Sequence, residues 1–78
     1  MMRLAPVIAK VLQVDESRIT EDASPAMIET WDSFNGLILV SELETVFKVK
    51  FTFQEVNAVK TVKDILDNLR NRGIEIDV

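Results

Sequence analysis

Residues 31–47, WDSFNGLILVSELETVF, decide the fold of this chain. At helical spacing they carry two apolar stripes on nearly opposite faces of one helix that begins after Asp32. The longer stripe is expected to pack on the core. Its members are Gly36, Leu39, Val40, Leu43, Val46 and Phe47. The shorter stripe starts one residue after Ser33 and is expected to stay near solvent. It consists of Phe34, Leu37, Ile38 and Ser41.

The chain before this stretch predicts one helix followed by a long loop. Residues 4–13 place apolar side chains at i, i+3, i+4, i+7 and i+8, which is typical of an amphipathic helix with Pro6 in its first turn. Periodicity then disappears over residues 14–31, which predicts a loop with one turn at Ser24-Pro25. A connection of this length in a small domain usually has a functional role.

The chain after this stretch predicts two more helices. Thr52 and Glu55 form a capping box that starts a short helix ending near Val59. Thr61 caps a longer helix, which Gly73 ends in a Schellman motif. The remaining residues, 74–78, are too few to indicate a strand, and we expect them to be irregular.

Composition indicates a compact globular chain. It has 47% hydrophobic residues, two glycines, two prolines and no cysteine among its 78 residues, so stability must come from core packing and not from disulfides. The expected fold is all-α: a four-helix bundle of three main helices and one short helix, with a long loop between helices one and two. Residues 1–78 are expected to form a single domain.

The charge distribution favours protein partners over nucleic acid. Residues 15–44 contain eight acidic residues and one basic residue, Arg18. Such a segment repels phosphate backbones and attracts basic protein surfaces. Residues 1–13 include Arg3 and Lys10 and show neither a membrane span nor a signal-peptide pattern. We therefore expect a cytoplasmic monomer that binds neither nucleic acid nor membrane.

The residue types present argue against catalysis and point to one serine. Without histidine or cysteine the chain can build neither a Ser-His-Asp triad nor a thiol nucleophile, so we expect no enzymatic activity. No metal site is expected either, since the paired acids lack the spacing of a calcium loop. The simplest interpretation of Asp32-Ser33 is an N-cap pair. Trp31, which precedes them, is expected to be a core anchor. A phosphodiester on the Ser33 hydroxyl would meet the positive end of the helix dipole.

At this point the chain resembles the acyl carrier protein family from about Leu4 to Gly73. Asp32-Ser33-Phe34 stands where that family has Asp-Ser-Leu at the start of its second helix. Further matching segments are Val14-Asp15, residues 19–24 (ITEDAS), Leu43-Glu44 with Phe47, and residues 61–65 (TVKDI).

The resemblance implies a function and a site. A phosphopantetheinyl transferase would attach 4'-phosphopantetheine from coenzyme A to Ser33, with Asp32 orienting the transferase's magnesium and substrate. The arm's thiol would then hold acyl intermediates as thioesters and pass them between biosynthetic enzymes with basic docking patches. The implied partner-binding residues are Phe34, Leu37, Ile38, Ser41, Glu42 and Glu44. The implied acyl-chain pocket is lined by Leu39, Val40, Leu43 and Ile65.

Departures from the family pattern leave the cargo and pathway open. Phe34 replaces the usual leucine, Asn35 and Ile38 stand where acids are common, and Gly36 weakens the helix by about 1 kcal/mol relative to alanine. This less acidic helix favours a dedicated, polyketide-like or other specialised pathway over general fatty acid synthesis. A peptidyl or aminoacyl carrier, and an acidic helical interaction module without a prosthetic group, are the alternatives.

Overall fold

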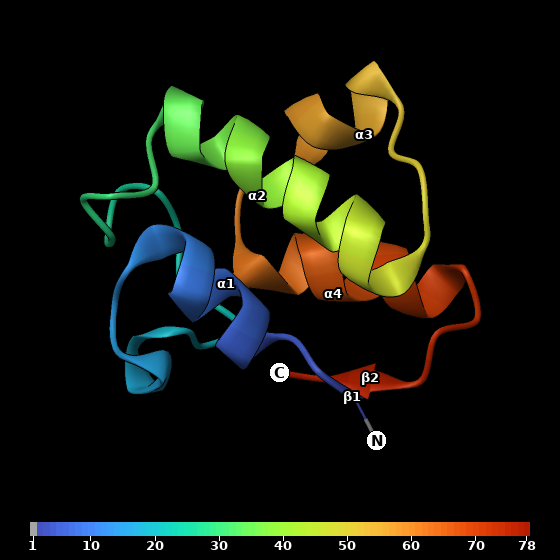
Figure 1. The fold of residues 1–78 in the computed structure, drawn as a ribbon, viewed down its shortest axis with the longest axis horizontal. Helices are drawn as coiled ribbons and strands as arrows, with labels where there is room; N and C mark the ends of the chain where they lie inside the picture. The colour runs from blue at the N-terminus through green and yellow to red at the C-terminus, as the bar shows by residue number, and fades with distance from the viewer. Residues whose placement is uncertain (1) are drawn as a thin grey trace.

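The computed structural model describes residues 2–78 and contains the four expected helices (Figure 1). They are α1 (Ala5–Leu12), α2 (Ser33–Phe47), α3 (Phe53–Ala58) and α4 (Val62–Asn71). The longest helix, α2, runs diagonally across the molecule, with α3 on one side of it and α1 and α4 on the other. The predicted all-α bundle of three main helices and one short helix is confirmed.

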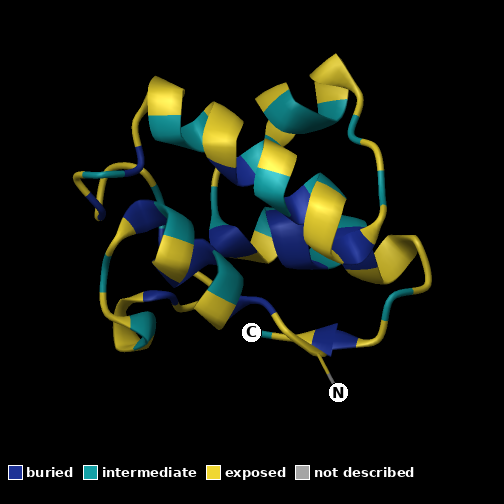
Figure 2. Ribbon diagram, in the orientation of Figure 1, coloured by how far each residue is buried: buried dark blue, intermediate teal, exposed yellow. Residues whose placement is uncertain are grey.

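The core forms where α2 meets α1 and α4. Leu39, Leu43 and Phe47 are the buried residues of α2, and Figure 2 shows the buried sides of the helices turned toward the centre of the molecule. The prediction for Val46 is wrong, because that side chain is 38% exposed. The buried residues follow an i+4 line, which places Val46 at the edge of the stripe. Gly36 and Val40 are half-buried.

The long loop between α1 and α2 is confirmed, but it contains a 3-10 turn, η1 (Glu16–Arg18), that the sequence interpretation missed. The Asp15 carboxylate caps this turn by accepting the Ser17 N–H at 2.9 Å. Farther along, the carbonyls of Glu21 and Ala23 accept the N–H groups of Lys63 and Val62 at 2.8 and 3.0 Å. The loop thereby satisfies free donors at the start of α4 and fixes its own path toward Ser33.

The capping box predicted for α3 is present, and at the start of α4 Asp64 Oδ2 accepts the Thr61 N–H at 3.1 Å. Glu55 accepts the Thr52 N–H at 2.8 Å, and the Thr52 hydroxyl accepts the Glu55 N–H at 3.1 Å. At the end of α4, Gly73 has a φ of +90° and the Ile74 N–H donates to the Leu69 carbonyl at 3.2 Å, as in a Schellman motif.

The expectation of an irregular tail is wrong. Strand β2 (Ile76–Asp77) pairs in parallel with β1 (Met2–Arg3), and the side chain of Ile76 is only 2% exposed. The Arg70 Nε–H donates to the Ile76 carbonyl at 3.0 Å and ties the strand to α4. The partner strand is more than 70 residues away in the sequence, so no local pattern indicates the pairing. Within residues 2–78, no helix combines the length and the apolar character that crossing a membrane requires.

Candidate functional site

The amino end of α2 presents Ser33 as an exposed first helical residue. Asp32 Oδ1 accepts the Asn35 N–H at 2.8 Å, so the predicted N-cap is present. The N–H groups of Ser33 and Phe34 lie in the first turn, where a helix offers no internal acceptor. The serine hydroxyl therefore lies beside backbone donors that suit an anionic group.

The side chain of Asn35 explains one departure from the family pattern. Its Nδ2 donates to the Thr30 carbonyl at 2.9 Å and fixes the end of the loop against the first turn of α2. A carboxylate at this position has no hydrogen to donate, so the acid that is common in the family could not make this bond. Asn35 thus holds the segment that carries Ser33.

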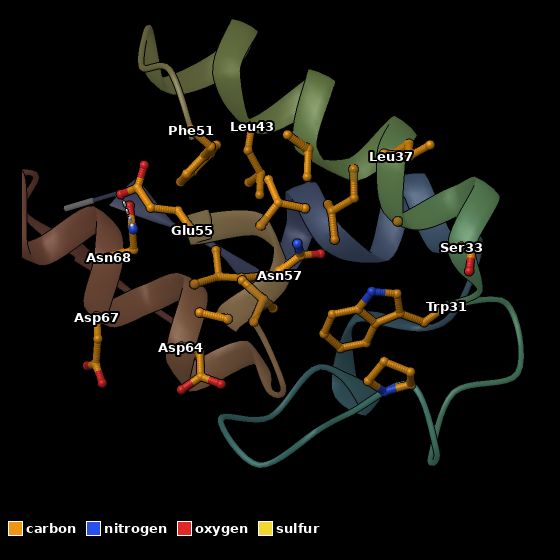
Figure 3. Close-up of a pocket in the computed structure, with 18 of the residues that line it drawn as sticks. Trp31, Ser33, Leu37, Leu43, Phe51, Glu55, Asn57, Asp64, Asp67 and Asn68 are labelled. Atoms are coloured by element: carbon orange, nitrogen blue, oxygen red, sulfur yellow. Dashed lines mark hydrogen bonds between the residues drawn. The ribbon is translucent and has the colours of Figure 1, made fainter. Parts of the chain in front are cut away.

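A cleft of about 750 Å³ opens beside Ser33 and extends between α2, α3 and α4 (Figure 3). Ser33 and Asp32 lie among its lining residues. The structure also brings together along this cleft all four side chains that the resemblance assigned to an acyl-chain pocket, which are Leu39, Val40, Leu43 and Ile65. Leu39 and Leu43 are almost fully buried, so they form its floor.

The wall opposite α2 carries polar residues that the sequence interpretation did not assign to the site. They come from α3 and α4 and are Glu55, Asn57, Asp64, Asp67, Asn68 and Asn71. The lining residues include four carboxylates and no lysine or arginine. The sequence signal for these residues is that they lie on the polar sides of two helices. That signal identifies the wall only once α3 is known to pack beside α4.

Trp31 is buried, with 7% exposure, so its prediction as a core anchor is confirmed. It also lines the cleft, which the sequence interpretation did not assign to it. A Cβ added to Gly36 would lie 3.9 Å from Trp31 Nε1, and no other atom outside the local backbone would lie nearer. The edge of the indole ring that carries the nitrogen therefore faces the first turn of α2, close to Ser33.

The shorter stripe of α2 is exposed, as predicted. Phe34 is 72% exposed, Leu37 is 67% exposed, and Ile38 and Ser41 are exposed as well. Glu42 is half-buried at the end of this surface. Glu44 is half-buried too, but its Oε2 accepts the Phe51 N–H at 2.8 Å. The carboxylate of Glu44 thus holds the segment before α3.

An ion pair connects α3 to the residue that follows α4. Arg72 contacts Glu55 at 3.0 Å, and the Asn68 amide donates to the same carboxylate at 2.7 Å. The Thr52 backbone N–H, then the Asn68 side chain and the Arg72 charge, lower the pKa of Glu55 from 4.5 to about 2. Glu55 therefore stays ionised and ties α3 to α4.

Comparisons with known proteins agree with this geometry. No family model matches the chain. It is 31% identical over 70 residues to an acyl carrier protein from Thermosynechococcus vestitus, which covers 90% of this chain and 86% of that protein. It is 34% identical over 68 residues to an acyl carrier protein from Syntrophobacter fumaroxidans, with coverages of 87% and 84%. A solved structure from Mycobacterium tuberculosis, assigned as an acyl carrier protein, superposes with a TM-score of 0.76 at 25% identity and covers 86% of this chain and 89% of that one. The chain belongs to the acyl carrier protein family, whose members are non-catalytic carriers.

Proposed function

We propose that this protein carries acyl intermediates as thioesters on a 4'-phosphopantetheine arm attached to Ser33 Oγ. The observation that supports this most is the position of Ser33, exposed on the first turn of α2 and at the mouth of the cleft. When bound, the arm supplies the terminal thiol that forms the thioester. The polypeptide has no cysteine, so it supplies no thiol of its own.

The attachment step is a phosphoryl transfer from coenzyme A. Ser33 Oγ bonds to the phosphorus next to pantetheine, the pyrophosphate bond breaks, adenosine 3',5'-bisphosphate leaves, and the serine proton passes to a base on the transferase. A phosphodiester on Ser33 would meet the positive end of α2, where the N–H groups of Ser33 and Phe34 could hold it. Asp32 uses Oδ1 for its cap, while no partner within residues 2–78 occupies Oδ2. We assign Oδ2 to orienting the transferase's magnesium.

The cleft is the proposed site for the acyl chain. Its apolar floor of Leu39 and Leu43 continues to Val40 and Ile65, so a hydrocarbon that packs on these side chains removes apolar surface from water. A volume of about 750 Å³ lies within the range of small-molecule sites.

The exposed stripe Phe34, Leu37, Ile38 and Ser41 is the proposed docking surface for partner enzymes, with Glu42 beside it. No residue from position 33 to position 41 is charged. Apolar contact therefore contributes more to docking here than attraction to a basic patch. This supports placing the carrier in a dedicated pathway, polyketide-like or otherwise specialised.

Mass spectrometry tests the attachment. After incubation with coenzyme A, magnesium and a broad-specificity phosphopantetheinyl transferase, we expect the wild-type protein to gain one phosphopantetheinyl group. Ser33→Ala should gain none. Ser17→Ala, which changes an exposed serine outside α2 and outside the proposed docking surface, should gain the group as the wild type does. Absence of any gain, or a gain that persists in Ser33→Ala, would leave an interaction module without an arm as the better description.

Asp32→Asn separates the two roles of Asp32. Asparagine caps helices as well as aspartate does, so the free energy of unfolding should change by less than about 0.5 kcal/mol. The loss of the carboxylate should slow loading of Ser33, because asparagine binds magnesium more weakly. The measurements are urea unfolding and the initial rate of arm transfer. Loading at the wild-type rate would show that Asp32 acts only as a helix cap.

A further inference from the structure

The indole nitrogen of Trp31 is a hydrogen-bond donor without a protein acceptor. The Trp31 side chain is more than nine-tenths buried, yet none of the side-chain hydrogen bonds within residues 2–78 involves Nε1. Within that part of the chain, the only fully enclosed side-chain polar atom without a partner is Thr30 Oγ1. The Trp31 N–H is therefore open to the cleft that the indole lines.

Gly36 keeps that donor accessible. A Cβ at position 36 would be in van der Waals contact with Nε1 at 3.9 Å, so a side chain there takes up space beside the nitrogen. Figure 3 shows the indole in the same part of the cleft as Ser33, with its nitrogen on the edge that faces α2. A buried N–H at this position loses a hydrogen bond to water whenever the cleft fills, unless the occupant supplies an acceptor.

The charges around the cleft restrict what that acceptor can be. Asp32, Glu55, Asp64 and Asp67 line it, and no lysine or arginine does. An anionic acceptor would enter among these carboxylates, of which Asp32 and Asp64 make no ion pair within residues 2–78, and would be repelled by them. A neutral carbonyl oxygen satisfies the N–H without that repulsion.

We propose that the Trp31 indole N–H donates a hydrogen bond to a neutral carbonyl oxygen that lies in the cleft. The oxygen belongs either to an amide of the arm on Ser33 or to an oxo group of the acyl cargo. This inference rests on attachment of the arm at Ser33. It makes Trp31 a specificity-determining residue that favours an occupant with an oxygen near the cleft mouth over a purely hydrocarbon occupant.

The single tryptophan makes the test direct, because ¹⁵N-labelled protein gives one indole N–H resonance. The resonance is recorded for the unloaded protein and for protein loaded with the free arm, a hexanoyl arm and a 3-oxohexanoyl arm. A downfield shift, with exchange against water slowed roughly five- to tenfold, is what one hydrogen bond of ordinary strength produces. The change in all three loaded forms identifies an arm amide as the acceptor. The change in the 3-oxohexanoyl form alone identifies the cargo.

Gly36→Leu is the matched control, since its side chain covers Nε1 while Ser33 stays available. Mass spectrometry identifies the loaded fraction of this variant, and in that fraction the indole resonance should not move downfield. Loaded wild-type protein with an unchanged or upfield-shifted indole resonance would overturn the inference and leave the proposed attachment standing. Failure of the wild type to load at all would overturn both.

Discussion

Helices α3 and α4 form the same wall of the cleft, but they are held by different forces. α4 buries Val62, Ile65, Leu66 and Leu69, whereas α3 has no buried residue at all. α3 is instead tied to α4 through Glu55, Asn68 and Arg72, and Arg72 Nη2 also donates to the Lys50 carbonyl at 2.7 Å. One half of the wall is thus fixed by apolar burial and the other by polar contacts.

The difference indicates which half gives way when the cleft takes an occupant. Segments with few buried apolar contacts open locally at much lower free energy than the core. The six residues of α3 are also too few to be helical by themselves. Displacing α3 breaks polar contacts that water can replace, while displacing α4 opens the core. We therefore expect α3 to be the movable side of the cleft.

Truncation of one apolar side chain in each helix should give the largest contrast. Leu66 is fully buried, so Leu66→Ala should lower the free energy of unfolding by about 2–5 kcal/mol. Val56 of α3 is only half-buried, so Val56→Ala should cost less than about 1 kcal/mol. Urea unfolding followed by the fluorescence of Trp31 measures both. Equal losses in the two variants would show that α3 contributes to the core as α4 does.

Removing the cap of α3 should have a smaller, local effect. Thr52→Ala loses the hydroxyl that accepts the Glu55 N–H, a change of about 1 kcal/mol. We expect hydrogen exchange of the α3 amides to accelerate about fivefold, while the slowest amides of α4 keep their rates. Thr45→Ala, on the exposed side of α2, should leave α3 unchanged. Equal acceleration in α3 and α4 would mean that the two helices unfold as one unit.

The sequence predicted the elements of this wall but not the contrast within it. Capping residues and periodicity are local, and Thr52, Glu55 and Gly73 were enough to place the ends of α3 and α4. The contact of Arg72 with Glu55 joins positions 17 residues apart, and the β1–β2 pairing joins opposite ends of the chain. Such contacts depend on the packed fold, and no local spacing encodes them.

The candidate site also has one part that the sequence indicates and another part that it does not. The amino end of α2 could be named from the helical pattern, and four apolar residues of the cleft (Leu39, Val40, Leu43 and Ile65) could be named from the family resemblance. The orientation of the Trp31 nitrogen toward Gly36 could not, since it depends on how the loop turns into α2. The structural bond of Glu44 to the Phe51 N–H was also hidden, because an acid on a helix gives no sign that it caps a neighbouring segment.

Acid should loosen α3 through Glu55, and this is the smallest effect that we expect. The pKa of Glu55 is about 2 in the folded protein against an ordinary value of 4.5, so between these values the unfolded chain binds a proton that the folded chain does not. The stability that Glu55 contributes is therefore fully present above pH 4.5 and is lost as the pH falls toward 2. The pKa values of Asp15 and Asp64 are lowered as well, by hydrogen bonds from the Ser17 and Lys60 backbone, so the wild type loses stability at several sites.

Glu55→Gln isolates the contribution of Glu55. Glutamine can still accept the Thr52 N–H of the capping box, but it has no charge for Arg72. Protection of the α3 amides from hydrogen exchange should then be weaker at neutral pH and should change little between pH 4.5 and 2. Asp15→Asn, in the loop after α1, should leave the acid sensitivity of α3 as in the wild type. If α3 in Glu55→Gln still lost protection over this range, a different carboxylate would be holding it, and the candidates are Glu44, which accepts the Phe51 N–H before α3, and Asp64, which accepts the Lys60 N–H after it.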